Sequence, residues 1–298
     1  MLIITGVNMR ARPFIKWAGG KRQILKHLVN SLGKFRNYHE PFLGGGALFF
    51  ELYNKKMINK AYLYDYNVEL INTYNIIRND VFSLINELKK PLYKNEKEAF
   101  YKIRSLEIND NIQSAARFIY LNRTAYNGLY RVNSHGKFNA PFGKYNHINL
   151  IDQEKLLLDS KALQTAELLA CDFSEVNKYA KKDDFVYFDP PYQPLSKTSS
   201  FTGYTDKCFG ENDQIRLAEI FKGLVAKGCN VMLSNSNTKL IHELYANYDI
   251  EEIYANRAIN SKGNRRGKIS ELIVRSWKSK QIRLFKSQEQ LISSISNR

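Results

Sequence analysis

The tetrapeptide Asp189-Pro190-Pro191-Tyr192 follows the apolar run 185–188, and its residue types suit one kind of chemistry. A proline pushes the residue before it toward extended backbone, so Asp189 and Pro190 are both expected to be extended. The Asp189 carboxylate and the Pro190 carbonyl can then accept hydrogen bonds from one amine, while Tyr192 offers a face to a planar ring. The tetrapeptide therefore predicts group transfer to an amino nitrogen on a flat ring. An ordinary strand-to-loop exit, where Asp and Pro are common, is the alternative.

A glycine-rich turn, Gly44-Gly45-Gly46, lies between a strand pattern and a helix pattern. Consecutive glycines permit a tight turn and let a ligand approach the backbone closely, although such turns also serve only to pack a helix on a strand. Asp65 ends the next strand pattern about 20 residues later, which is where an acid binds ribose hydroxyls. Because the turn does not match G-x-G-x-x-G, a nicotinamide cofactor is not expected.

Upstream, Trp17 and Lys21 flank two glycines. The Lys21 ammonium can pair with the carboxylate of an amino-acid-like cofactor, and Trp17 can form an apolar wall beside it. A helix start with a packed tryptophan and a solvated lysine is the alternative. The phosphate-binding pattern G-x-x-x-x-G-K-[ST] is absent. A cofactor with a ribose and a carboxylate but no phosphate fits S-adenosylmethionine.

The segment 122–145 interleaves basic, amide and aromatic side chains and contains no acid. Arginine and asparagine read guanine and adenine edges, and lysine anchors phosphates. A second basic cluster, 262–268, is open to three interpretations: a mobile lid, a phosphate clamp or a solvated face. The chain has 45 Lys+Arg against 29 Asp+Glu, a net charge of +16. This balance favours a polyanion partner, with nucleic acid ahead of an acidic membrane.

Composition also narrows the class of protein. The three cysteines, Cys171, Cys208 and Cys229, match neither a disulfide framework nor a zinc pattern. No apolar stretch is long enough to span a bilayer, and the opening residues are too short for a signal peptide. We therefore expect a cytoplasmic, reduced and metal-free protein with no membrane partner.

Short apolar runs alternate with amphipathic stretches, a pattern typical of an α/β fold. The expected strands are 38–41, 61–64, 167–171, 185–188, 230–233 and 271–276, and the expected helices include 46–53, 67–77 and 211–227. Asp65, Asp172 and Asp189 each come at the end of one of these strands. Ligands bind outside the carboxyl ends of strands in such sheets, so the three acids predict a row of ligand contacts along one edge.

The interval 79–163 interrupts this alternation with helical patterns at 97–105 and 112–122 and then a polar loop. We predict that 79–163 is an inserted, mostly helical target-recognition domain. The catalytic domain would then be discontinuous, formed by 11–78 and 164–278. The tail 279–298 receives no role.

Four motifs, at 13–21, 41–48, 122–145 and 189–192, together resemble the Dam-type DNA adenine methyltransferases. The resemblance covers most of 13–277, follows the alpha-group order, and is closest to members that modify GATC and often accompany a restriction enzyme. It implies a Rossmann-like S-adenosylmethionine methyltransferase sheet, double-stranded DNA as substrate and a prokaryotic or phage source. A restriction endonuclease is an expected functional partner, and a monomer and a weak dimer both stay open.

The resemblance also implies roles for the matching positions. The expected catalytic residues are Asp189, Pro190, Pro191 and Tyr192. The expected cofactor contacts are Trp17, Lys21, Phe42, Gly44, Gly46, Asp65, Asp172, Phe173 and Asp189. The expected DNA contacts are Lys16, Arg123, Tyr126, Asn127, Leu129, Arg131, Pro141 and Tyr145. Among these, Arg131 would read a guanine edge and Leu129 would discriminate by apolar contact, while Tyr130 between them is a departure from the smaller side chains of other members.

The expected reaction is methyl transfer to the exocyclic amine of adenine. Two acceptors would make that poorly nucleophilic nitrogen more pyramidal, and alignment with the methyl group can supply about 7–11 kcal/mol. The base must be flipped out of the stack, with Tyr192 receiving it. The absence of a Pro-Cys dipeptide argues against cytosine C5 methylation, which needs a thiolate. The alternatives are a cytosine amine, an RNA adenine or a protein amide as acceptor, and a catalytically silent DNA-binding protein.

Overall fold

The structure is a computed structural model that describes residues 9–17, 19, 21, 24–194, 209–256 and 268–278. Its core is a seven-stranded, mostly parallel sheet in the order β3-β2-β1-β4-β5-β7-β6, which confirms the predicted α/β class. The chain divides into two compact units. Among the described residues, the first contains 9–17, 19, 21 and 37–175, and the second contains 24–36, 176–194, 209–256 and 268–278.

Three parallel strands organise the first unit: β1 (Tyr38–Glu40), β2 (Ala61–Asp65) and β3 (Ala166–Ala170). β2 and β3 are mostly apolar, β1 is a buried Tyr-His-Glu strand, and all three lie close to their predicted positions. Asp65 pairs with Ala170 in the β2–β3 register, and the Cys171 amide donates to the Asp65 carbonyl at 3.0 Å. Asp65 and the segment that carries Asp172 therefore lie at the same edge, as predicted for these two acids.

Four helices of the first unit start at side-chain caps. Asn67, Asp80, Asp110 and Asp152 each accept a hydrogen bond from a backbone amide one turn into the helix that follows, which satisfies one of its unpaired donors. The helices are α2 (Ala47–Asn54), α3 (Val68–Asn79), α4 (Val81–Leu88), α5 (Lys97–Ser105), α6 (Asn111–Thr124), α7 (Gln153–Leu163) and the short helices η1 (Tyr126–Gly128) and η2 (Phe173–Glu175).

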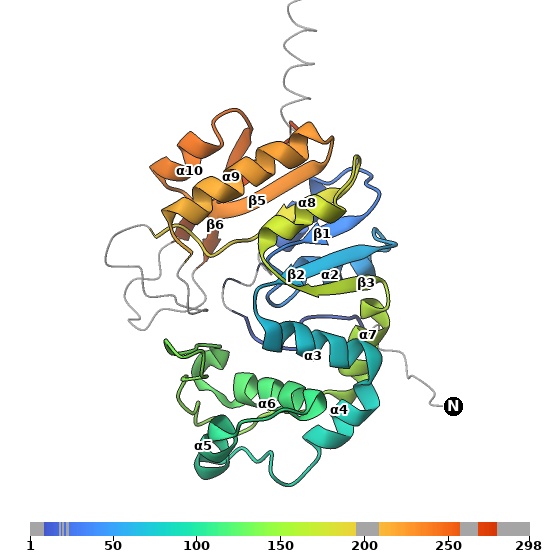
Figure 1. Cartoon of the computed structure of the whole chain (residues 1–298), viewed down its shortest axis with the longest axis vertical. Coiled ribbons are helices and arrows are strands. Elements are labelled where there is room, and N and C mark those ends of the chain that lie inside the picture. Colours follow the sequence, from blue (N-terminus) through green and yellow to red (C-terminus); the bar gives the residue numbers. More distant parts are fainter. Residues whose placement is uncertain are drawn as a thin grey trace, which may run out of the picture. The chain divides into compact units, whose positions relative to one another are not determined.

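The predicted recognition segment 79–163 is mostly helical. The structure places α5 and α6 at the predicted positions, and adds α4 and α7, which were not predicted. In Figure 1, α6 lies beside α3, and these two helices pack together. The segment thus shares one unit with β1, β2 and β3. Its division from the rest as a separate recognition domain stays a prediction.

The second unit contains β4 (Phe185–Phe188), β5 (Asn230–Ser236), β6 (Asp249–Asn256) and β7 (Lys268–Arg275). β4 and β5 are parallel, whereas β7 is antiparallel to both β5 and β6. The helices are α1 (Leu25–Asn30), α8 (Val176–Tyr179), α9 (Glu211–Ala226) and α10 (Lys239–Leu244), and Figure 1 shows α9 lying along β5. β6 was missed because the acidic residues of this edge strand mask its apolar alternation.

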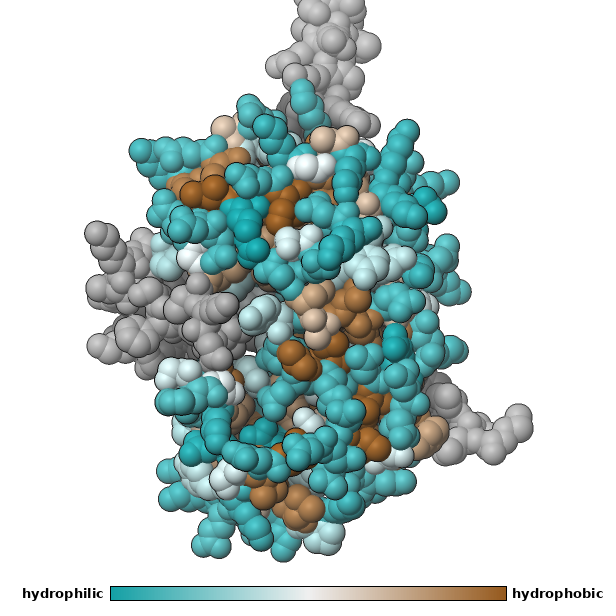
Figure 2. Space-filling model, in the orientation of Figure 1, coloured by the Kyte–Doolittle hydropathy of each residue, from teal (hydrophilic) through white to brown (hydrophobic). Residues whose placement is uncertain are grey.

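Hydrophilic residues cover most of the face drawn in Figure 2, and hydrophobic residues appear there in separate small patches. Within the described ranges, no helix combines the length and apolar character needed to cross a membrane. The tail 279–298 and the basic cluster 262–268, apart from the backbone of Lys268 at the start of β7, lie outside the described residues.

Candidate active site

The Asp65 carboxylate holds the glycine turn at the carboxyl end of β2. Its Oδ2 accepts from the Gly44 amide at 2.9 Å, and its Oδ1 accepts from the Asn67 amide at 2.9 Å. Gly44 has φ +47°, and a β-carbon there would stand 2.6 Å from Trp17 Cδ1. Only glycine fits this position without strain, so the turn, the strand end and the start of α3 form one rigid corner.

Burial raises the pKa of the Asp65 carboxyl, while backbone amides of Asn67, Gly44 and Tyr66 oppose that rise. A carboxylate offers about four acceptor positions. Asp65 therefore keeps acceptor capacity for the hydroxyls of a ligand. Tyr66, next in the chain, is 57% exposed beside this corner and was not predicted as a site residue; its place directly after the acid is the signal that could have found it.

Two aromatic rings meet near the same strand ends. Phe42 follows β1, Phe173 follows β3, and their rings stack with centroids 5.2 Å apart. Asp172 Oδ1 accepts from the Ser174 amide at 3.0 Å, which shapes the turn that carries Phe173. The structure thus brings together Phe42, Asp172 and Phe173, three of the predicted cofactor residues.

Trp17 and Lys21 are both packed into the first unit. The Trp17 ring stacks on Tyr130 at 5.5 Å and on Phe118 at 6.5 Å between centroids. Lys21 is only 7% exposed, and its Nζ donates to the Gly19 carbonyl at 3.0 Å. The packed tryptophan matches the structural alternative, but the lysine is buried rather than solvated. A buried ammonium requires nearby acceptors, which suits a carboxylate ligand.

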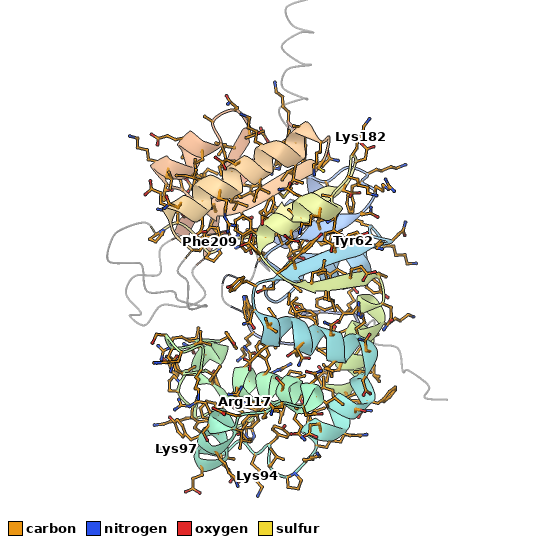
Figure 3. All side chains as sticks on the ribbon, viewed as in Figure 1. Tyr62, Lys94, Lys97, Arg117, Lys182 and Phe209 are labelled. Carbon is orange, nitrogen blue, oxygen red and sulfur yellow. The ribbon has the colours of Figure 1, made fainter. Side chains whose placement is uncertain are left out.

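Tyr130, the departure noted in the sequence, is buried and connects the recognition segment to α3. Its hydroxyl donates to Glu69 Oε2 at 3.0 Å, and its ring stacks on Trp17. Glu69 Oε1 also accepts from Arg117 Nη1 at 3.3 Å; Arg117, on α6, is labelled in Figure 3. Tyr130 is therefore a packing residue that lies between the two proposed DNA readers in sequence but faces inward.

One buried amide joins the amino-terminal segment to the recognition segment. Asn122 is fully buried; its Oδ1 accepts from the Lys16 amide at 2.9 Å, and its Nδ2 donates to the carbonyls of Lys16 at 2.8 Å and Gly128 at 3.1 Å. Lys16 Nζ lies 5.0 Å from the centre of the Tyr145 ring. The site prediction did not include Asn122, although an amide on the buried face of an apolar helix is a detectable signal.

The turn after α6 gathers several predicted DNA contacts. The Tyr126 amide donates to the Pro141 carbonyl at 2.9 Å, and Tyr126 is 52% exposed. Asn127 has φ +55°, and a β-carbon on Gly128 would stand 2.5 Å from Lys16 Cδ. Tyr126, Asn127 and Pro141 therefore lie together on one exposed turn, and the close approach of Lys16 at Gly128 sets its position.

The two arginines among the predicted DNA contacts differ in what they bind. Arg131 is exposed, and Asn139 binds its guanidinium. Nε donates to Asn139 Oδ1 at 2.7 Å, and Nη2 donates to the Asn139 carbonyl at 3.1 Å. Leu129, two residues earlier, is half-buried. Arg123 donates through Nη2 to the Phe14 carbonyl at 2.8 Å, and burial lowers its pKa. The structure therefore gives Arg123 a contact inside the protein, and its role in DNA binding stays a prediction.

In the second unit, the predicted catalytic tetrapeptide leaves the carboxyl end of β4. Asp189 is half-buried, Pro190 is buried, and the Tyr192 hydroxyl donates to Glu271 Oε2 at 2.9 Å. Burial raises the pKa of Tyr192 far above its ordinary value, and the nearby Asp189 and Glu271 carboxylates raise it further. Tyr192 is therefore a neutral phenol that acts as a hydrogen-bond donor, with its ring held in one orientation.

Buried side chains from α9 and β5 bind the backbone on both sides of Tyr192. Gln214 Nε2 donates to the Pro191 carbonyl at 3.1 Å, and the Gln193 amide donates to Asn235 Oδ1 at 3.1 Å. Ser236 Oγ donates to the Gln193 carbonyl at 2.6 Å. The sequence prediction did not include Gln214, Asn235 or Ser236; the polar Ser-Asn-Ser ending of an otherwise apolar strand is the signal that marks two of them.

Comparison with known proteins adds independent information. A family model described as "D12 class N6 adenine-specific DNA methyltransferase" matches residues 17–259. This range contains the glycine turn, the recognition segment and the Asp-Pro-Pro-Tyr tetrapeptide.

Relatives of nearly the same length match over most of the chain. The type II methyltransferase M.MjaIII of Methanocaldococcus jannaschii is 41% identical over 290 residues, which cover 90% of this chain and 100% of the relative. The type II methyltransferase M1.LlaDCHI of Lactococcus lactis subsp. cremoris is 43% identical, covering 91% and 97%. A DNA adenine methylase of Haemophilus influenzae is 33% identical, covering 90% and 94%. The chain therefore belongs to the D12 class of N6 adenine-specific DNA methyltransferases.

Proposed function

We propose that this adenine-specific DNA methyltransferase takes its methyl group from S-adenosylmethionine and modifies the adenine of GATC in duplex DNA. The observation that carries the assignment of the catalytic loop is the anchored Asp189–Tyr192 segment at the carboxyl end of β4, with the Tyr192 hydroxyl bound to Glu271. Such anchoring holds an acceptor pair and an aromatic face in fixed positions before the substrate arrives.

The residues of the first unit fit S-adenosylmethionine. The buried Lys21 ammonium would bind its carboxylate, and Asp65, with acceptor capacity left, would bind its ribose hydroxyls. The glycine turn lets Trp17 pack directly against the backbone at Gly44, where a side chain would intrude. Phe42, Phe173 and Asp172 would receive the adenine. Trp17, Gly44 and Gly46 shape this corner, and Asp189 is proposed as a further contact. When bound, this cofactor supplies an electrophilic methyl carbon on a sulfonium.

The protein's own residues would prepare the adenine amine. The Asp189 carboxylate and the Pro190 carbonyl accept hydrogen bonds from its two N–H groups, which withdraws the nitrogen lone pair from the ring and makes the nitrogen more nucleophilic. As the nitrogen gains its new bond it must lose a proton, and the Asp189 carboxylate is the acceptor for that proton. Tyr192 stacks on the flipped base, and Pro191 keeps the loop extended.

Residues of the recognition segment support the proposal that the substrate is duplex DNA and the target sequence is GATC. Lys16, Tyr126, Asn127, Pro141 and Tyr145 lie around one turn of the first unit, where lysine can bind phosphate. The exposed Arg131 fork, held by Asn139, would bind guanine O6 and N7 bidentately, and the neighbouring Leu129 would contact a base by its apolar surface. GATC itself rests on the similarity of segment 122–145 to members that modify this sequence.

We further propose that the enzyme protects DNA against a companion restriction endonuclease. The names of two similar proteins, both type II methyltransferases, support this role. The high identity over nearly the whole length of each relative supports a shared arrangement of the recognition segment.

Methyl incorporation tests these proposals together. Purified protein would be incubated with radiolabelled S-adenosylmethionine and duplexes that contain either GATC or the same bases scrambled, and digestion would identify the labelled nucleoside. We expect label only in N6-methyladenine from the GATC duplex. Equal label in both duplexes would contradict the target sequence, and label in cytosine or no label would contradict the proposed acceptor or donor. Asp189→Ala serves as the control and should abolish incorporation while DNA binding persists.

A further inference from the structure

The backbone after Asp189 cannot be held by the hydrogen bonds between neighbouring strands that hold β4. Pro190 and Pro191 have no amide hydrogen, so this stretch cannot continue the hydrogen-bonded ladder of β4. Three polar backbone groups flank Tyr192: the carbonyl of Pro191 before it, and the amide and carbonyl of Gln193 after it. Each of these three groups is bound by a side chain.

The side chains that bind these groups form a connected network. Asn235 Nδ2 donates to Gln214 Oε1 at 3.0 Å, and Gln214 Nε2 donates to the Pro191 carbonyl at 3.1 Å. Asn235 Oδ1 accepts from the amides of Gln193 at 3.1 Å and Ser236 at 2.8 Å. Gln214 and Asn235 are fully buried. Because rotating either amide would bring an oxygen opposite an oxygen acceptor, the network has a single arrangement.

This single arrangement determines where the loop lies. A buried amide left without a partner is costly, so the network opposes any shift of the backbone that would break these bonds. Pro191 is held on one side of Tyr192 and Gln193 on the other, while Glu271 holds the hydroxyl. A packed apolar wall would bury the loop equally well but would not specify the position of its carbonyl and amide groups.

We propose that Gln214, Asn235 and Ser236 are positioning residues for methyl transfer, a role that rests on the proposed catalytic loop. They hold Pro191 and Gln193, and through them the Tyr192 ring and the Asp189-Pro190 acceptor pair, in the geometry that the adenine amine requires. A displacement of about 1 Å at a reacting centre can cost roughly a hundredfold in rate. The three residues act through the loop backbone and make no contact with the base themselves.

Gln214→Glu isolates one bond of this network. The introduced carboxylate keeps the size of the side chain and still accepts from Asn235 Nδ2, but it places an acceptor opposite the Pro191 carbonyl. We expect kcat to fall about tenfold to a hundredfold, while KM for S-adenosylmethionine and for DNA stays within about twofold. A residue that served stability alone would change the melting temperature and the fraction of active enzyme, but not kcat per folded molecule.

The pH profile of Gln214→Glu provides a second measurement. At low pH the introduced carboxyl group takes up a proton, and its O–H can then donate to the Pro191 carbonyl as the glutamine does. The ratio of wild-type kcat to variant kcat should therefore decrease toward one as pH falls. The titratable groups nearest to the loop are Asp189, Tyr192 and Glu271. Both proteins contain them, so their contribution to the pH dependence cancels in this ratio.

Two further variants complete the test. Ser236→Ala removes the hydroxyl that donates to the Gln193 carbonyl at 2.6 Å and lies 3.4 Å from Asn235 Oδ1. It decides the question should Gln214→Glu fail to fold. Gln153→Glu is the matched control, because Gln153 is exposed in the first unit and its Oε1 already accepts from Lys89. Folded Gln214→Glu and Ser236→Ala proteins with wild-type kcat, or with a raised KM alone, would overturn the inference. Activity retained by Asp189→Ala would instead refute the catalytic loop itself.

Discussion

At the scale of single residues, the site depends on residues that are each held in position by several contacts. Tyr192 is held by its hydroxyl and by both neighbouring backbone groups, and Gly44 is held between Asp65 and Trp17. Asp189, Pro190 and Tyr192 have residue types that suggest their chemistry directly. The residues that hold them, such as Gln214 and Asn235, have types that occur in any buried polar network.

The Tyr192 ring and its hydroxyl should contribute separately to activity. Tyr192→Ala removes the stacking face, and stacking of a base on an aromatic ring is worth about 1–3 kcal/mol, so kcat/KM for DNA should fall by roughly 5- to 150-fold. Tyr192→Phe loses the hydroxyl bond to Glu271 but keeps the ring, and it should retain most of kcat/KM. Steady-state kinetics on a GATC duplex would measure both. Equal losses in the two variants would show that the ring is not the stacking face.

Gly44→Ala should destabilise the first unit. The new methyl group would stand 2.6 Å from Trp17 Cδ1, and φ at this position is +47°. Strain of this kind costs about 1–3 kcal/mol in the free energy of unfolding. Gly223→Ala in α9 is the control, since a β-carbon there meets nothing within 4 Å and alanine is favoured in helices by about 1 kcal/mol. Urea unfolding should show a lower free energy of unfolding for Gly44→Ala and a higher one for Gly223→Ala. An unchanged free energy of unfolding for Gly44→Ala would contradict the geometry.

At the scale of elements, side chains carry connections that backbone pairing does not. α6 is tied to the amino-terminal segment by Asn122 and to α3 by the Arg117–Glu69 contact. Arg117 also donates to the carbonyls of Ile103 and Arg104, which closes the carboxyl end of α5. These polar contacts give the recognition segment a defined position within its unit.

Asn122→Ala should weaken both the fold and DNA binding. It removes the three hydrogen bonds of a buried side chain and leaves the carbonyls of Lys16 and Gly128 without this partner. Each buried group left unsatisfied costs about 1–3 kcal/mol. DNA affinity at constant salt should fall because Lys16 and the following turn lose their common anchor. Asn72→Ala, which removes one exposed bond to the Asn111 carbonyl, is the control and should change neither quantity much. Unchanged DNA affinity in folded Asn122→Ala would refute the anchoring role.

At the scale of the whole molecule, the +16 charge and a buried ion network act on different properties. The positive charge favours a polyanion such as DNA. Within the second unit, Arg275 is almost fully buried and pairs with Glu251 and with Asp249 at 3.2 Å, while His27 lies 3.0 Å from Glu251. These contacts join α1, β6 and β7 and concern stability rather than recognition.

The stability of the protein should fall in acid partly through Glu251. Burial alone would raise the pKa of its carboxyl, but hydrogen bonds from Arg275 and His27 outweigh it, and the pKa lies below the ordinary value of 4.5. A lowered folded-state pKa contributes stability above about pH 4.5 that is lost as pH falls through the folded-state value. Urea unfolding across this range should show a shallower pH dependence for Glu251→Gln than for wild type. The exposed Glu243→Gln should leave the slope unchanged.

Several elements could be predicted from local patterns. β4 is a run of four buried residues, and α5 begins and ends at its predicted positions, because apolar periodicity alone is enough to identify them. α4 was not predicted, because Asp80 ends α3 and caps α4 without a loop that would mark a new helix. β6 was missed because acidic residues at the edge of the sheet hide its alternation.

The sequence by itself determined the α/β class, the chemistry suggested by the Asp-Pro-Pro-Tyr tetrapeptide and the glycine turn followed by Asp65, because each depends on residue type and short spacing. Only the tertiary structure showed that Tyr130 stacks on Trp17, that Asn122 binds Lys16, and that Gln214 and Asn235 hold the tetrapeptide. The partners in these contacts lie more than 20 residues apart in the chain. The packing of whole helices and strands decides which partner a buried polar side chain meets, and the local sequence does not predict that packing.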